Sequence, residues 1–145
     1  MNIPFVKLRE NAHEPIYATK GAAAADLRAA IPEEIELQPG QRMIVPTGLA
    51  IALPEGFVAL LFARSGLAAK HGIALANSVG VIDSDYRGEI GVALINLGSA
   101  PYRIQPGERI CQMMVLPISQ ACFAAVSALP ESERGEGGFG STGKQ

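Results

Sequence analysis

The sequence predicts an all-β fold of the sandwich or barrel type in a single chain of 145 residues. Turn residues are frequent, because the chain holds 16 glycines and 10 prolines that recur at short intervals. The runs between them are short and rich in apolar and β-branched residues, which is typical of strands joined by tight turns. A chain of this length fits one domain and is too short for two of full size.

The expected strands follow one another between the turn signals. Residues 90–95 and 110–116 are apolar on both alternating faces, so we expect a second sheet or a neighbouring subunit to cover each face. The whole set of expected strands comprises residues 34–37, 42–45, 49–53, 57–62, 89–96 and 109–116.

One short helix is expected from Ser65 to about His71, because the side chain of Ser65 can cap it and Gly72 can end it. Residues 131–145 hold almost no apolar surface that folding could bury. We therefore expect a β domain over residues 1–130 and a mobile, Gly-rich tail over residues 131–145.

The charge of the chain excludes several classes of partner. The 12 Lys and Arg residues against 14 Asp and Glu residues give a net charge of −2, which leaves no basic surface for polymeric nucleic acid or an anionic membrane. No apolar stretch reaches the roughly 18 residues of a membrane span, and the first residues lack a signal-peptide layout, which predicts a cytoplasmic protein. Charged residues make up only 18% of the chain, which favours burial of part of its exterior against other subunits.

The tail contains a lone aromatic residue, Phe139, among glycines. The N–H groups of these glycines and the hydroxyls of Ser141 and Thr142 can surround phosphate oxygens. Arg134 can pair with a terminal phosphate, and Phe139 can stack on a base. A disordered Gly-Ser terminus without a ligand is the plainer alternative.

A second candidate lies where the strand expected over residues 57–62 meets the expected helix. Free N–H groups at a helix start attract anions, and Arg64 adds a positive charge beside them. A helix cap by Ser65 explains the same residues without a ligand.

Residues 77–89 predict a strand, a tight turn and a second strand, with two carboxylates in the turn. Asp83 and Asp85 can be ordinary turn residues that accept hydrogen bonds from their own backbone. Alternatively, Asp83 at the end of a strand can hold a water molecule as a general base, and Tyr86 can pack on a sugar.

Two polar residues stand in apolar surroundings: Asp26 follows the run Ala22–Ala25, and Gln112 lies inside an expected strand. Burial without a partner is costly, so each residue is expected to have one. Asp26 can hydrogen-bond a metal-bound water, and Gln112 can donate to a phosphate. Ordinary core polar groups with protein partners are the alternative.

Five segments, taken in chain order, resemble the five motifs of the trimeric dUTPase family. A single segment is a weak signal, but five in order, at family-like spacing and over nearly the whole chain, are specific. Ala24 departs from the family, which usually has glycine just before its motif aspartate. The segments are Ala23–Leu27, Arg64–Ala68, Gly80–Glu89, Gly107–Gln112 and Arg134–Gly143.

The resemblance implies hydrolysis of dUTP to dUMP and pyrophosphate, which lowers dUTP, limits uracil incorporation into DNA and supplies dUMP for thymidylate synthesis. It also implies a jelly-roll-like β fold and a homotrimer whose active sites draw on more than one chain. Carried over to this sequence, Asp83 is the general base that orients water for in-line attack on the α-phosphorus. Asp26 is expected to contact Mg²⁺ through water, with the ion itself on the triphosphate.

The resemblance also assigns substrate-binding residues in three groups. The phosphates are expected to contact Arg64, Ser65, Gly66 and Gln112. Uracil is expected to be read by the main chain at Gly80, Val81, Ile82, Asp83 and Gly91 and by the side chain of Asn77, while Tyr86 packs against deoxyribose. The tail is expected to close over the nucleotide through Arg134, Phe139, Gly140, Ser141 and Thr142.

Two other functions stay open on the sequence alone. A deoxycytidine-triphosphate deaminase of the same fold needs a hairpin with a glutamate base, which residues 82–86 do not resemble. A non-catalytic protein that senses dUTP in the same pocket binds the nucleotide without releasing pyrophosphate.

Overall fold

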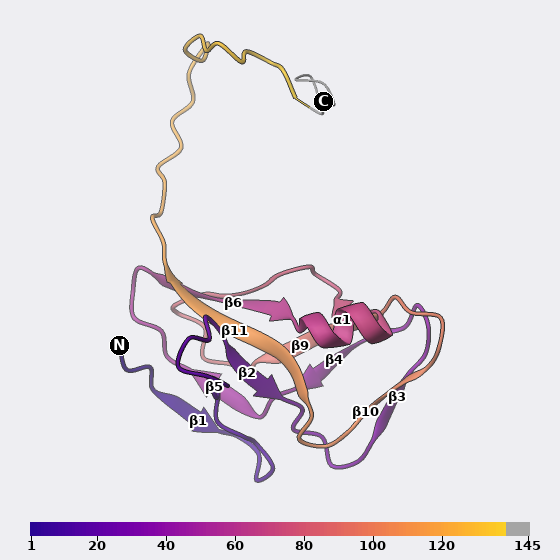
Figure 1. Cartoon of the computed structure of the whole chain (residues 1–145). Coiled ribbons are helices and arrows are strands. Elements are labelled where there is room, and N and C mark those ends of the chain that lie inside the picture. The colour runs from indigo at the N-terminus through magenta and orange to yellow at the C-terminus, as the bar shows by residue number, and fades with distance from the viewer. Residues whose placement is uncertain (139–145) are drawn as a thin grey trace.

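The computed structural model describes residues 1–138, and strands form most of its regular structure (Figure 1). The strands are β1 Phe5–Lys7, β2 Ala25–Arg28, β3 Ile35–Leu37, β4 Arg42–Pro46, β5 Leu49–Ile51, β6 Phe57–Ala63, β7 Ile73–Leu75, β8 Gly80–Ile82, β9 Gly91–Asn96, β10 Tyr102–Ile104 and β11 Arg109–Pro117. A four-stranded sheet has the order β2-β11-β6-β8, and a three-stranded sheet has the order β4-β9-β7. Two further pairs, β1-β5 and β10-β3, complete the antiparallel pairing.

The two larger sheets share one apolar core. Leu27 and Met113 of the four-stranded sheet are buried in the same cluster as Val92 and Leu94 of the three-stranded sheet. Each fully buried side chain of this kind contributes about 1.5–3 kcal/mol to the free energy of unfolding. Because one core joins two antiparallel sheets, the all-β prediction is confirmed.

All six expected strands are present, with their ends shifted by one or two residues. The strand expected over residues 49–53, for example, ends at Ile51. The sequence pattern does not predict β1, β2, β7 or β10. Each of these strands has only three or four residues, which is too short to show an alternation of apolar and polar positions.

The two faces of β9 and β11 are covered to different extents. Val92 and Leu94 of β9 are buried in the core, whereas Ala93 and Ile95 on the opposite face are half-buried. In β11, Leu116 is exposed. The chain itself therefore buries one face of β9 from Val92 onward and the core-facing side of β11 as far as Met113, and coverage of the other faces by a neighbouring subunit stays a prediction.

The helix α1, Ser65–His71, lies where it was expected, but its start differs. Arg64 occupies the N-cap position and makes no side-chain hydrogen bond to the helix, so the interpretation of Ser65 as the cap is wrong. Ser65 is instead the first helical residue, which leaves its hydroxyl free of a capping role. As predicted, Gly72 ends the helix, with φ 71°. Its N–H donates to the Ala68 carbonyl oxygen.

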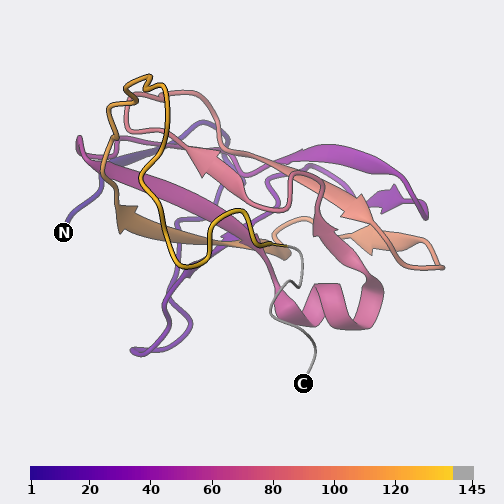
Figure 2. The ribbon, with the colours of Figure 1, turned by 90° about the horizontal axis from the view of Figure 1, so that it is seen from above.

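After β11 the chain leaves the body of the molecule as an extended segment (Figure 1), and Figure 2 shows the same segment from above. Within the described part of the chain, residues 118–138 form no strand or helix. Phe123, Val126 and Leu129 along this segment are exposed. The division at residue 130 stays a prediction. Among residues 1–138, no helix is long and apolar enough to cross a membrane.

Candidate active site

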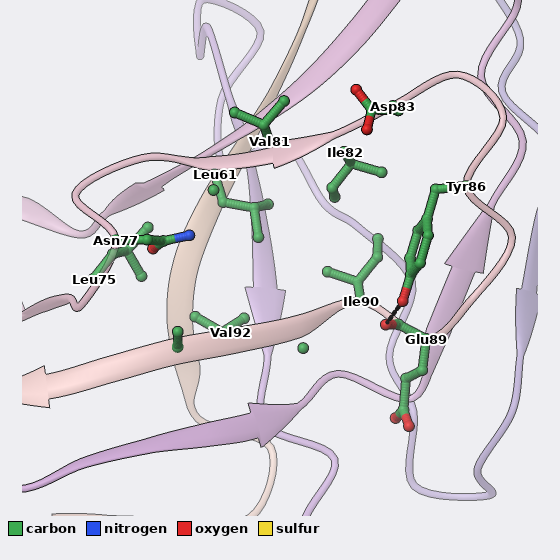
Figure 3. A pocket seen from close by; sticks show the side chains of 13 residues that line it. Leu61, Leu75, Asn77, Val81, Ile82, Asp83, Tyr86, Glu89, Ile90 and Val92 are labelled. Atoms are coloured by element: carbon green, nitrogen blue, oxygen red, sulfur yellow. Dashed lines mark hydrogen bonds between the residues drawn. The ribbon is translucent and has the colours of Figure 1, made fainter.

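A pocket of about 190 Å³ lies between β8 and β9 (Figure 3). The two strands do not pair with each other, because β8 pairs with β6 while β9 pairs with β4 and β7. The prediction of a tight hairpin turn is therefore wrong, and residues 83–90 form a longer connection between the two sheets. Because each strand joins a different sheet, the two strands spread apart and leave room for a ligand between them.

Buried apolar side chains from both sheets form the floor of this pocket, and polar groups stand at its rim. The floor consists of Leu61, Leu75, Ile82, Ile90 and Val92. In Figure 3 the amide nitrogen of Asn77 points into the space between the strands, and Tyr86 stands at the opposite end. All residues expected to contact uracil and the sugar line the pocket, namely Asn77, Gly80, Val81, Ile82, Asp83, Tyr86 and Gly91.

β8 is an edge strand whose second side carries unpaired main-chain groups. Among residues 1–138 it pairs only with β6, in the order β2-β11-β6-β8. Along an antiparallel strand the N–H and C=O groups of successive residues point alternately to the two sides, so every second residue of β8 offers free groups beside the pocket. A Cβ atom on Gly80 would lie 3.0 Å from the Cβ atom of Leu61, which is tighter than ordinary packing. Glycine there lets the strand pass close to β6.

The connection after β8 carries Asp83 and Tyr86. Asp83 is exposed, and in Figure 3 its carboxylate lies on the same side of the ribbon as Val81, away from the apolar floor. The Tyr86 hydroxyl donates to the Glu89 carbonyl oxygen at 3.0 Å. Arg87 lies in the same connection and stabilises its fold. Its Nη1 donates to the carbonyl oxygens of Ser84 at 2.6 Å and of Tyr86 at 2.8 Å.

A second group of predicted site residues meets at Asp26, which is 5% exposed. Arg64 Nε lies 3.2 Å from Asp26 Oδ1, and Arg109 Nη1 donates to Oδ2 at 3.0 Å. Gln112 Nε2 lies 3.5 Å from Oδ1, at the outer limit of a hydrogen bond. Two guanidinium groups and one carboxylate leave a net positive charge, which suits an anion such as a phosphate.

Burial raises the pKa of the Cys111 thiol to about 12, and the negative charge of Asp26 adds to this rise. Cys111 is therefore a neutral thiol in the core.

A β-bulge in β11 brings Arg109 into this cluster. In a regular strand, residues 109 and 112 would project from opposite faces, because they are three positions apart. The register of β11 against β2 shifts between Arg109 and Cys111, so Arg109 and Gln112 both reach the carboxylate of Asp26. Sequence reasoning missed Arg109 as a site residue, and no local pattern signals such a bulge.

The Asp26 cluster and the pocket lie on opposite faces of the four-stranded sheet. Gln112 pairs across the strands with both Asp26 and Phe62, and paired residues project from the same face. Phe62 and Gln112 line a hollow of about 320 Å³ together with Ala22, Ala23 and the half-buried Ala24. Leu61, the neighbour of Phe62 in β6, lines the pocket instead. Successive strand residues point to opposite faces, so one chain holds the two halves of the predicted site apart.

The remaining predicted residues fall into two groups. Ser65 and Gly66 are exposed at the start of α1, next to Arg64. Arg134 is exposed, and its Nε donates to the carbonyl oxygen of Gly137 at 2.7 Å. The tail residues Phe139, Gly140, Ser141 and Thr142 lie outside the described residues.

An apolar slot with polar rims and a separate cluster with two arginines, both on a β sandwich, suit a ligand that combines a flat ring with an anionic group, as a nucleotide does. The sequence profile described as dUTPase matches residues 10–143. The chain therefore belongs to the dUTPase family.

Curated relatives carry the name deoxyuridine 5'-triphosphate nucleotidohydrolase. The protein of Neisseria meningitidis serogroup A is 57% identical over 130 residues, which cover 89% of this chain and 87% of that protein. The protein of Desulfitobacterium hafniense is 54% identical over 144 residues, which cover 99% of this chain and 95% of that protein.

Solved dUTPase structures share the fold. The dUTPase of Staphylococcus bacteriophage 80alpha with dUPNHPP has a TM-score of 0.91 and 30% identity, and the match covers 99% of both chains. A mutant dUTPase from phage phi11 of S. aureus has a TM-score of 0.81 and 25% identity, covering 88% of this chain and 98% of that one. The latter structure concerns the coordination of a structural Mg(II) ion. The predicted fold class is thus confirmed.

Proposed function

We propose that this chain is a dUTP diphosphatase that hydrolyses dUTP to dUMP and pyrophosphate in active sites built by more than one copy of the chain. The family and the named relatives support the reaction. The site residues and the trimer are predictions of the resemblance, and the cytoplasmic location is a prediction from the sequence pattern.

The observation that carries the proposal is the separation of the two half-sites within one chain. Leu61 contributes to the base pocket and Phe62 to the hollow beside the anion cluster, on opposite faces of one sheet. One dUTP molecule must contact both a base site and a phosphate site. This need is met if a second copy of the chain presents its Asp26 cluster to the pocket. A closed trimer repeats the arrangement three times.

The pocket recognises uracil by shape and by hydrogen bonds. Free main-chain groups of β8 and the amide of Asn77 pair with the polar edge of the ring, while the buried floor contacts its faces. Cytosine carries an amino group where uracil has a carbonyl, so it leaves groups unpaired in the pocket and is rejected. Tyr86 packs against the deoxyribose at the rim, where a 2′-hydroxyl would clash.

Asp83 acts as the general base. Its exposed carboxylate at the pocket rim holds a water molecule, which attacks the α-phosphorus in line with the leaving group. A new P–O bond forms as the bond to the bridging oxygen breaks, the water proton passes to Asp83, and pyrophosphate leaves with the electron pair. Arg64, Ser65, Gly66 and Gln112 of the neighbouring copy donate to the phosphates where charge accumulates.

The tail completes the site in this proposal. The segment that begins at residue 118 leaves the body of its own chain (Figure 1), so it can carry the end of the chain toward another copy. Arg134 and the residues after it then close over the nucleotide and exclude bulk water, as other enzyme lids do.

The side chains do not fit a directly held Mg²⁺ ion. Within residues 1–138, no three His, Cys, Asp or Glu side chains come together as a metal site. Asp26 is already paired with two arginines, whose charges repel a bare cation. Mg²⁺ prefers phosphate oxygens and retains several waters, so it would arrive on the triphosphate and neutralise its charge. The water-mediated contact to Asp26 stays a prediction.

Pyrophosphate release with Mg²⁺ from dUTP, dCTP, dTTP and UTP, assayed in parallel at equal concentration, tests this function. We expect release from dUTP alone. Binding of dUTP without release would favour a sensor, and release from all four nucleotides would contradict a base-selective pocket.

A deaminase is the weaker candidate for a structural reason. Glu89 is the glutamate that lines the pocket, but its carboxylate accepts hydrogen bonds from Arg9 and from the Gly48 N–H. A glutamate held in this way is not free to serve as a base for ring chemistry. A deaminated nucleotide formed from dCTP would overturn this conclusion.

A further inference from the structure

We propose that Glu89 and Arg9 are positioning residues that hold Tyr86 in place and thereby set the discrimination between deoxyribonucleotides and ribonucleotides. The proposal rests on the proposed function, in which Tyr86 contacts the sugar. It adds a role for a carboxylate at the pocket rim and for an arginine that lies before the segment matched by the family profile.

The carboxylate of Glu89 joins three segments that are distant in sequence. Arg9 Nε donates to Oε1 at 2.8 Å, and Arg9 Nη2 donates to Oε2 at 3.0 Å, so the pair is bidentate. The N–H of Gly48, in the turn between β4 and β5, donates to Oε1 at 2.8 Å. Both oxygens are thus engaged in fixed directions, which orients the whole residue.

Fixing the Glu89 side chain also fixes its main chain, to which Tyr86 is bonded. The Tyr86 hydroxyl donates to the Glu89 carbonyl oxygen at 3.0 Å (Figure 3). The next residue, Ile90, is tied to the same turn, because Thr47 Oγ1 donates to its carbonyl oxygen at 2.7 Å. A rigid carbonyl acceptor therefore stands at one end of the tyrosine ring.

Tyr86 needs this acceptor because packing alone does not hold it. Tyr86 is 46% exposed, so its ring can leave the rim without opening the core. Gly88 lets the ring lie close, since a Cβ atom on residue 88 would overlap the Tyr86 hydroxyl. An exposed ring can take several orientations. The hydrogen bond from the Tyr86 hydroxyl to the Glu89 carbonyl oxygen selects one of them.

The Glu89 carboxylate and the Arg9 guanidinium are both charged at neutral pH. The hydrogen bond from Arg9 holds the pKa of the Glu89 carboxyl below its usual value, against a smaller opposing effect of burial. The bidentate ion pair is accordingly intact under ordinary assay conditions.

The test compares kcat/KM for dUTP and UTP in Glu89→Gln and Arg9→Lys. Glu89→Gln keeps the size of the side chain but removes its charge, and Arg9→Lys keeps the charge but loses the bidentate geometry. We expect the dUTP-to-UTP ratio of kcat/KM to fall by about tenfold or more, while kcat for dUTP changes by less than about threefold. Arg103→Lys is the matched control, because Arg103 Nε bonds Glu36 Oε2 at 3.0 Å on the β3-β10 pair. Its ratio should equal that of the wild type.

A double variant separates positioning from general destabilisation. If Glu89 acts through Tyr86, adding Glu89→Gln to Tyr86→Phe lowers the ratio no further than Tyr86→Phe alone. The proposal would be overturned if the double variant lowered the ratio by the sum of the two single effects. It would also be overturned if both single variants kept the wild-type ratio, including the case in which kcat/KM falls equally for dUTP and UTP. A wild-type protein that releases no pyrophosphate from dUTP would instead overturn the proposed function.

Discussion

Asp26 and Gln112 face each other across β2 and β11, with Gln112 Nε2 3.5 Å from Asp26 Oδ1. The same carboxylate holds the guanidinium groups of Arg64 and Arg109. Asp26 is thus the centre around which the side chains proposed to bind phosphate are arranged, and its burial keeps water from competing for them.

Replacing Asp26 by Asn should lower both stability and activity. The amide keeps the size of the side chain but removes the negative charge that offsets two arginines. Leaving such groups without a charged partner typically costs about 1–3 kcal/mol, and misplaced arginines raise KM for dUTP. Urea unfolding and steady-state kinetics measure the two effects. Glu36→Gln, in an exposed ion pair, is the control. Wild-type KM in the Asp26 variant would show that the cluster does not bind phosphate.

Asp83→Asn should abolish turnover and leave binding intact. The amide cannot accept the water proton, and loss of a general base lowers kcat by about 100-fold or more. Asp83 is exposed, so the change removes no core contact. Calorimetry with dUTP measures binding, and pyrophosphate release measures turnover. A variant with near-normal kcat would exclude Asp83 as the base.

Truncation after Glu133 should leave a folded protein with little activity. The last strand ends at Pro117, and the removed residues contribute no strand or helix within the described part of the chain. We therefore expect an unchanged melting temperature and a loss of about 100-fold in kcat/KM, because the lid no longer orders the phosphates. Full activity of the shortened chain would refute the role of the tail.

The Glu89–Arg9 pair predicts a pH dependence of stability. The pKa of Glu89 in the folded protein lies below the ordinary value of 4.5, mainly because Arg9 donates to it. A lowered folded pKa contributes stability above the unfolded value, and this contribution is lost as pH falls through the folded value. The urea midpoints of wild type and Glu89→Gln should therefore differ at pH 7 and converge well below pH 4.5. A constant difference at all pH values would contradict the assignment.

The sequence predicted the longer strands better than their arrangement, and the roles of the site residues stay predictions. Long apolar runs such as residues 109–116 reveal strands because they hold enough consecutive apolar and β-branched residues to show the pattern. The three-residue strand β7 shows no such run, since pairing with a neighbour rather than a local pattern selects it.

The sequence pattern did not predict features that depend on tertiary structure. The spread of β8 and β9 depends on which sheet each strand joins, and the turn residues between them look like those of an ordinary hairpin. Arg109 reaches Asp26 only because of a bulge. Arg9 and Glu89 are 80 positions apart, and neither stands in an unusual local context.

Subunit complementation tests the central claim, which is that the base pocket and the Asp26 cluster of one active site come from different copies of the chain. Asp83→Asn and Arg64→Gln are each expected to be inactive, and gel filtration verifies that both assemble like the wild type. The two variants are then unfolded and refolded together as an equal mixture. In a shared site, about half of the pockets carry an intact Asp83 and about half of the neighbouring clusters carry an intact Arg64, so about one quarter of the sites receive both. The mixture should therefore restore about one quarter of wild-type pyrophosphate release. A mixture as inactive as its components would contradict the shared site and place both residues in one chain's active site.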